Sequence, residues 1–172
     1  MIIVYASKTG FAKKYARMLS EKLGMDMVDV KELPKVPKVP KESEVLYLGW
    51  MKVGKVQGLQ KMKGHKVVAV CGSGTGRTAE PSEEEVRKRN GLENTPFFYL
   101  RGGCRPLRDL KGMDKMMLSM FVKALKKNAE KDERQKEAVE IILHGFDGVR
   151  EENLTPVLEW INRKFSLTDK IS

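Results

Sequence analysis

The first 23 residues combine a buried strand, a short polar turn and an amphipathic helix. Residues 1–6 are an unbroken apolar run, typical of a strand buried in a parallel sheet. From Ala12 to Leu23, apolar side chains recur at helical spacing. A helix N-terminus presents free N–H groups and a partial positive charge, so the hydroxyl- and glycine-containing turn favours a phosphate site. Its candidate residues are Ser7, Lys8, Thr9, Gly10, Phe11 and Ala12.

A polar turn between a strand and a helix that binds no ligand would have the same sequence pattern. The choice between these two interpretations therefore depends on the rest of the chain. Further apolar strands are predicted at 25–30, 44–51, 65–71 and 95–100. The segment 31–41 has three prolines at three-residue intervals, which predicts an extended crossover rather than a helix. We therefore expect an α/β fold with a doubly wound, five-stranded parallel sheet of order 2-1-3-4-5.

Three predicted loops rich in glycine or hydroxyl groups follow the first, third and fourth strands. They are Ser7–Ala12, Gly49–Lys55 and Gly72–Arg77. Ligands of such sheets bind at the carboxyl ends of the strands, so we expect the three loops to converge on one site. Besides the first turn, the candidate binding residues are Gly49, Trp50, Met51, Lys52, Gly72, Ser73, Gly74 and Thr75.

Two of these loops resemble those of flavodoxins. The turn at 7–12 is similar to their FMN-phosphate loop, Ser/Thr-x-Thr-Gly-x-Thr, and Cys71-Gly72-Ser73-Gly74 is similar to their flavin-ring loop. Ala12 replaces the last hydroxyl, which should weaken phosphate binding by about 1 kcal/mol or somewhat more. The resemblance implies a flavodoxin-like fold and FMN as the cofactor, with its phosphate at 7–12 and its ring beside 49–52 and 72–75.

The two aromatic side chains that enclose the ring in typical flavodoxins are missing from an ungapped match. Val53 and Thr78 stand in their places, and Trp50 lies three residues before the first of them. Two roles are open for Trp50: stacking on the ring or packing in the core. A less shielded ring would favour an enzyme or a site covered by a partner.

Residues 105–150 exceed what a minimal flavodoxin-like fold needs, and we interpret them as a helical insertion after the fifth strand. The main helix, 112–127, has a wide face rich in Met, Leu and Phe, with lysines towards its end. This face is expected either to pack on the sheet or to form an adaptable binding or membrane-contacting surface. A second helix is predicted over 134–143. A last helix, capped by Thr155, should cover the sheet beside the first helix.

This layout resembles the flavodoxin-like protoporphyrinogen oxidase family. The segments that carry the resemblance are Arg101-Gly102-Gly103 and Asp114-Lys115-Met116-Met117. The resemblance implies FMN-dependent oxidation of a tetrapyrrole intermediate at a membrane, with electrons passed to quinone or another acceptor. Arg101 and Lys52 are candidates for contacts with an anionic substrate or with the flavin.

The chain is basic, with a net charge of +10 and a pI near 9.6. This charge suits anionic ligands or membrane surfaces. Nucleic-acid binding is not expected, because the Lys-rich segments contain few aromatic residues for base stacking. The two cysteines and two histidines have no metal-like spacing, so no metal site is expected. With no long apolar segment, we expect one cytoplasmic domain over 1–172, with peripheral membrane contact as an alternative.

Together these patterns predict an FMN-binding redox protein. Its electrons would pass to a redox partner protein, a quinone or an anionic small molecule. The sequence leaves open whether it is an electron carrier or a dehydrogenase that resembles protoporphyrinogen oxidase. The alternative is a flavin-free, flavodoxin-like binding module that acts through its basic surface and Met-rich helix. Ala12 and the missing aromatic residues keep that alternative open.

Overall fold

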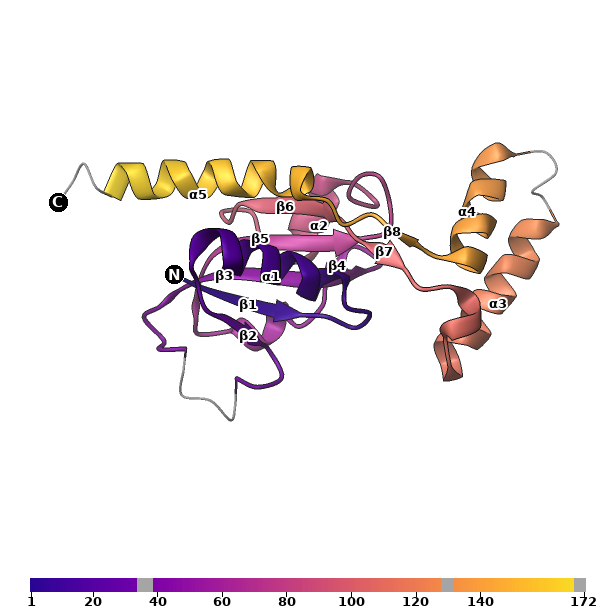
Figure 1. Cartoon of the computed structure of the whole chain (residues 1–172), viewed down its shortest axis with the longest axis horizontal. Coiled ribbons are helices and arrows are strands. Elements are labelled where there is room, and N and C mark those ends of the chain that lie inside the picture. Colours follow the sequence, from indigo (N-terminus) through magenta and orange to yellow (C-terminus); the bar gives the residue numbers. More distant parts are fainter. Residues whose placement is uncertain (34–38, 128–131, 169–172) are drawn as a thin grey trace. The chain divides into compact units, whose positions relative to one another are not determined.

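The computed structural model describes residues 1–33, 39–127 and 132–168. The chain divides into two compact units, one formed by Met1–Gly102 with Val149–Ser172 and the other by Gly103–Gly148 (Figure 1). The second unit corresponds closely to the predicted insertion over 105–150. Each unit is described by itself below.

The first unit is built on a parallel sheet with strand order β2-β1-β3-β5-β6. Counted along the main strands, this is the predicted order 2-1-3-4-5, so the α/β fold class is confirmed. A short strand, β4, pairs antiparallel with the end of β3. The strands are β1 Ile2–Ala6, β2 Met27–Asp29, β3 Glu44–Lys52, β4 Lys55–Val56, β5 Lys66–Gly74 and β6 Phe97–Arg101.

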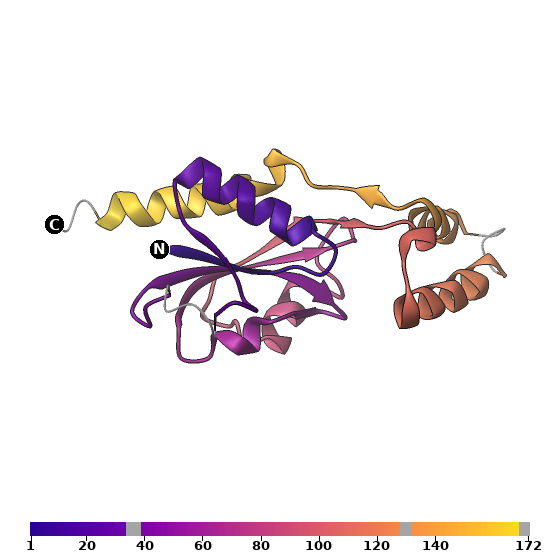
Figure 2. The same ribbon diagram turned by 60° about the horizontal axis from the view of Figure 1, so that its bottom comes forward.

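Helices cover both faces of this sheet, as Figure 2 shows. The indigo-to-purple α1 and the yellow α5 lie on one face, where Tyr15, Leu19 and Ile161 pack against buried side chains of β1 and β3. The 3₁₀ turn η1 and helix α2 lie on the other face, where Met62 and Val86 are buried. The helical elements are α1 Phe11–Leu23, η1 Leu59–Met62, α2 Glu83–Arg89, η4 Glu151–Leu154 and α5 Thr155–Thr168.

The strands extend further than the sequence predicted, and this changes the surroundings of the candidate site. β5 continues from its predicted end at residue 71 to Gly74, and β3 continues from residue 51 to Lys52, so residues 49–52 and 72–74 of the expected ligand loops are strand residues. Parallel pairing continues through Trp50–Ser73 and Gly74–Arg101, so glycine does not end these strands. The backbone hydrogen bonds of neighbouring strands outweigh the low strand propensity of glycine.

Two other local predictions differ from the structure. The second half of the expected loop 49–55 is a β-hairpin formed by β3 and β4. Thr155 does not cap α5, because η4 leads directly into it and Thr155 has helical dihedral angles, φ −49° and ψ −50°. Residues 34–38 of the predicted proline-rich crossover lie outside the described residues.

The second unit is a pair of helices on a short two-stranded stem. Strands β7 Gly103–Cys104 and β8 Phe146–Asp147 pair antiparallel. Between them lie the turn η2 Leu107–Asp109 and the helices α3 Gly112–Lys126 and α4 Glu133–His144, which confirm both predicted helices of the insertion. The unit has its own small core, centred on Val122, Val139 and Ile142.

Candidate functional site

The turn between β1 and α1 has the backbone geometry of an anion site. Gly10 precedes the helix with φ +99°, and its N–H donates to Ser7 Oγ at 3.1 Å. The first intrahelical bond runs from the Lys14 N–H to the Gly10 carbonyl, at 2.9 Å. The N–H groups of residues 11–13 therefore precede the helical ladder and point out of the helix end. A Cβ on Gly10 would meet nothing within 4 Å, so the space beside the turn is open.

The side chains of Ser7, Lys8 and Ala12 differ in their contacts and in their exposure to solvent. Ser7 Oγ accepts a bond from Gly10, which leaves its O–H group to donate to a ligand. Ala12 is only 2% exposed, so it offers a ligand its backbone N–H rather than its side chain. Lys8 is exposed, and its Nζ lies 5.5 Å from the centroid of the Trp50 ring. This cation–π contact joins the turn to the end of β3.

The end of α1 nearest the turn is also tied to the rest of the sheet. The Tyr15 hydroxyl donates to the Arg101 carbonyl at 2.6 Å, and Asn153 Nδ2 donates to the same hydroxyl at 2.5 Å. These bonds connect α1 to β6 and η4. They hold the helix N-terminus at the carboxyl edge of the sheet, which is where ligands of doubly wound folds bind.

Several predicted binding residues lie in closely packed parts of the sheet. A Cβ on Gly49 would lie 2.5 Å from Val56 Cγ1, and a Cβ on Gly72 would lie 2.6 Å from Met51 Sδ. Both glycines, together with Ser73, are buried. The absence of a Cβ on the two glycines allows neighbouring side chains to approach their backbones closely. Cys71 is also buried, and burial raises the pKa of its thiol, which keeps it protonated.

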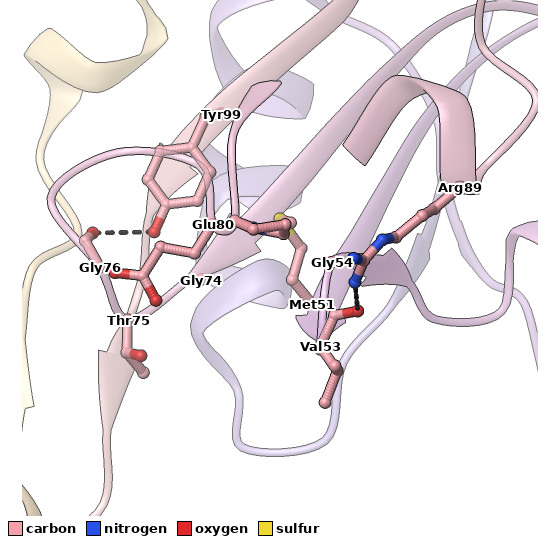
Figure 3. Close-up of a pocket in the computed structure, with 10 residues that line it drawn as sticks. Met51, Val53, Gly54, Gly74, Thr75, Gly76, Glu80, Arg89 and Tyr99 are labelled. Carbon is pink, nitrogen blue, oxygen red and sulfur yellow. Dashed lines mark hydrogen bonds between the residues drawn. The ribbon is translucent and has the colours of Figure 1, made fainter. Parts of the chain in front are cut away.

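A cavity of about 360 Å³ opens beyond the ends of β3, β5 and β6 (Figure 3). This volume falls within the usual range for ligand pockets. Of the predicted residues it includes Met51, Gly74 and Thr75, whereas Trp50 and Lys52 are not part of its wall. The complete wall is formed by Met51, Val53, Gly54, Gly74, Thr75, Gly76, Glu80, Pro81, Arg89 and Tyr99.

One side of the cavity is fixed by Tyr99 of β6. Its hydroxyl donates to the Gly76 carbonyl at 2.8 Å, and this bond holds the loop after β5 (Figure 3). Burial, together with the negative charge of Glu80, raises the pKa of Tyr99. The hydroxyl therefore stays protonated and keeps its role as a donor at physiological pH.

A comparison with protein families identifies this architecture. A sequence model described as the flavodoxin domain matches residues 2–132. The chain belongs to the flavodoxin domain family. No curated protein matches the chain. The more specific resemblance to protoporphyrinogen oxidases therefore stays a prediction.

Flavodoxin domains typically bind FMN, and the two halves of the site suit the two ends of this cofactor. The first turn offers the N–H groups of residues 11–13, the Ser7 hydroxyl and open space beside Gly10 for a phosphate. The cavity offers Met51 and Tyr99 as partly apolar walls and the backbone of 74–76 as polar partners. Both halves lie at the carboxyl edge of the same sheet.

The other wall of the cavity in this flavodoxin domain is the β3–β4 hairpin. Lys52 pairs with Lys55, and the two residues between them, Val53 and Gly54, have φ angles of 49° and 72°. Positive φ at both central positions is the signature of a type I′ turn. Arg89 Nη1, at the end of α2, donates to the Val53 carbonyl at 3.2 Å (Figure 3). Helix α2 therefore holds the hairpin over the cavity.

Val53 is a strained residue at the tip of this hairpin. A β-branched residue with positive φ is a conformational outlier, and the Val53 side chain is 80% exposed, so packing does not compensate. We expect Val53→Asn to increase the free energy of unfolding by about 1 kcal/mol, because asparagine tolerates this conformation. Urea denaturation measures the change. Val53→Ile is the matched control and should leave stability unchanged, since it keeps both the branching and the strain. Equal effects of the two substitutions would contradict this explanation.

Sequence reasoning missed four of the ten residues that wall the cavity, Glu80, Pro81, Arg89 and Tyr99, whereas the other six lie in the predicted loops 49–55 and 72–77. Tyr99 could have been found from the alternation of buried side chains along β6, which places it on the same face as Phe97. Glu80, Pro81 and Arg89 carry no local signal, because the fold brings them to the cavity from the loop before α2 and from the helix itself.

Proposed function

We propose that this flavodoxin-domain protein binds FMN and transfers electrons between redox partners. The observation that carries the proposal is the Lys8–Trp50 contact, which joins the candidate phosphate turn to the strand that continues into the cavity hairpin. Bound FMN would supply reversible electron transfer at its ring.

In this proposal the residues of the chain bind and orient the cofactor. The helix N-terminus and the Ser7 hydroxyl would hold the phosphate, with the exposed Lys8 ammonium contributing positive charge. The hairpin at 51–54 and the backbone of 74–76 would line the ring, and Tyr99 would hold the second of these segments in place. The missing hydroxyl at residue 12 would make phosphate binding depend on backbone donors.

Titration of FMN into flavin-free protein tests this function. We expect saturable 1:1 binding in the micromolar range or tighter, equivalent to about −8 kcal/mol. The readouts are quenching of flavin fluorescence and a perturbed visible absorption spectrum. Binding that does not saturate, or that riboflavin matches in affinity, would contradict a site built around the phosphate.

Oxidation of a porphyrinogen-like substrate is the second candidate function. It is favoured by the hairpin tip, where the small and exposed Val53 occupies the position expected for an aromatic cover. A ring without that cover would be open to an anionic tetrapyrrole, with a quinone or a partner protein as acceptor. The test is porphyrin fluorescence after FMN-loaded protein and a quinone are mixed with a porphyrinogen. An electron carrier would leave the substrate unoxidised beyond the rate seen with FMN alone.

A further inference from the structure

Five large apolar side chains on α3 are more than half exposed. The exposed fractions are 68% for Met113, 53% for Met116, 54% for Met117, 65% for Met120 and 52% for Phe121. Their spacing of three and four residues places them in one continuous line along the helix, called here the Met stripe. Among the described residues, only Val53 and Phe165 are other exposed large apolar side chains. Exposed apolar surface is therefore concentrated on this helix.

The helix pair does not use the Met stripe for its own folding. The buried side of α3 carries Val122, with Leu118 and Leu125 packed beside it, and it meets Val139 and Ile142 of α4. These residues form the small core of the unit, and they lie on a different side of α3 from the Met stripe. A contiguous apolar surface that its own core leaves exposed marks an interaction site in most soluble proteins.

The surroundings of the Met stripe are positively charged. Seven basic and two acidic residues lie between positions 105 and 127. Lys123 and Lys127 are exposed, and the helical repeat places them beside the Met stripe. Of the two acids, Asp109 already lies 3.6 Å from Arg108. An apolar line with cations along its edge is the pattern of a helix that binds an anionic membrane surface.

We propose that the Met stripe and its lysines dock this chain onto an anionic lipid bilayer, with α3 lying in the plane of the interface. Helix α3 contains no Trp, Tyr or Arg, the residues that dominate the binding energy of protein–protein interfaces. Flexible methionine side chains can enter an acyl-chain layer without needing hydrogen-bond partners. No helix in the described parts of the chain is long and apolar enough to cross a membrane, so the contact is peripheral. The proposal does not depend on flavin binding.

Co-sedimentation of the full chain with lipid vesicles tests the docking. We expect binding to vesicles of 70% phosphatidylcholine and 30% phosphatidylglycerol, and at least about tenfold weaker binding to pure phosphatidylcholine. The triple variant M116Q/M117Q/M120Q should lose about tenfold or more in affinity, because the apolar contact is removed. Glutamine has nearly the helix propensity of methionine, so the helix is kept. The matched control M116L/M117L/M120L should bind like the wild type.

A second pair of variants distinguishes the effect of the lysines beside the Met stripe on vesicle binding from the effect of the net charge of the chain. K123Q/K127Q should weaken binding to the anionic vesicles about tenfold or more, whereas K61Q/K63Q, with the same net charge, should not. Circular dichroism checks that each variant is folded. Absence of wild-type binding to anionic vesicles at low salt would overturn the proposal. So would a dimer in analytical ultracentrifugation that M116Q/M117Q/M120Q dissolves, since the Met stripe would then bind a second copy of the chain.

Discussion

Replacing Thr9 by glutamate should weaken FMN binding by at least about 100-fold. Thr9 directly precedes Gly10 at the N-terminus of α1, so a carboxylate there would lie against the phosphate. Two like charges about 4 Å apart repel by roughly 4 kcal/mol near a protein surface. The new carboxylate would also compete for the N–H groups of residues 11–13. An acidic residue at a helix N-terminus is favourable, so the variant should stay folded. Fluorescence titration measures the loss.

Two comparisons make the Thr9→Glu result specific. Glutamine has nearly the same size as glutamate but no charge, so Thr9→Gln should weaken FMN binding much less than Thr9→Glu. Riboflavin lacks the phosphate, so its affinity should be nearly unchanged in Thr9→Glu. If Thr9→Glu bound FMN as tightly as the wild type, the phosphate would have to lie elsewhere and the proposed site would be wrong.

The N-terminal half of the site could be predicted because its local signals agree with the fold. The apolar run of β1, the glycine before α1 and the helical spacing after it each favour the observed element. The five-stranded order followed from repeated strands and crossovers, and the structure confirms it. Ser7 and Gly10 were predicted at the turn, and the bond between them is what shapes it.

The second half of the site could be predicted only in part, because non-local contacts bring Glu80, Pro81, Arg89 and Tyr99 to the cavity. Gly49 and Gly72 were predicted to line the flavin ring because they begin glycine- or hydroxyl-rich loops that resemble those of flavodoxins. The groups that approach them are Val56 and Met51, which the hairpin brings back over the sheet. Valine disfavours the positive φ that this turn requires, so the local sequence around Val53 does not predict a hairpin.

Asn90, the residue that follows α2, should be essential for the hairpin. Its Oδ1 accepts from the Val56 N–H at 2.9 Å, and its Nδ2 donates to the carbonyls of Gly54 and Val86 at 2.8 and 2.7 Å. Asn90→Ala removes three partly buried hydrogen bonds and leaves the hairpin groups unpaired. We expect the free energy of unfolding to fall by about 2–4 kcal/mol, measured by urea denaturation.

The effect of Asn90→Ala on binding should differ from that of Thr9→Glu. A loosened hairpin disturbs the cavity for the ring, so the affinities for FMN and for riboflavin should fall together. Ser82→Ala is the matched control, because Ser82 Oγ caps the other end of α2 by accepting from the Glu85 N–H at 3.1 Å. It should cost about 1 kcal/mol of stability and leave flavin affinity nearly unchanged. A loss of binding in Ser82→Ala equal to that in Asn90→Ala would mean that general destabilisation, rather than the position of the hairpin, controls the site.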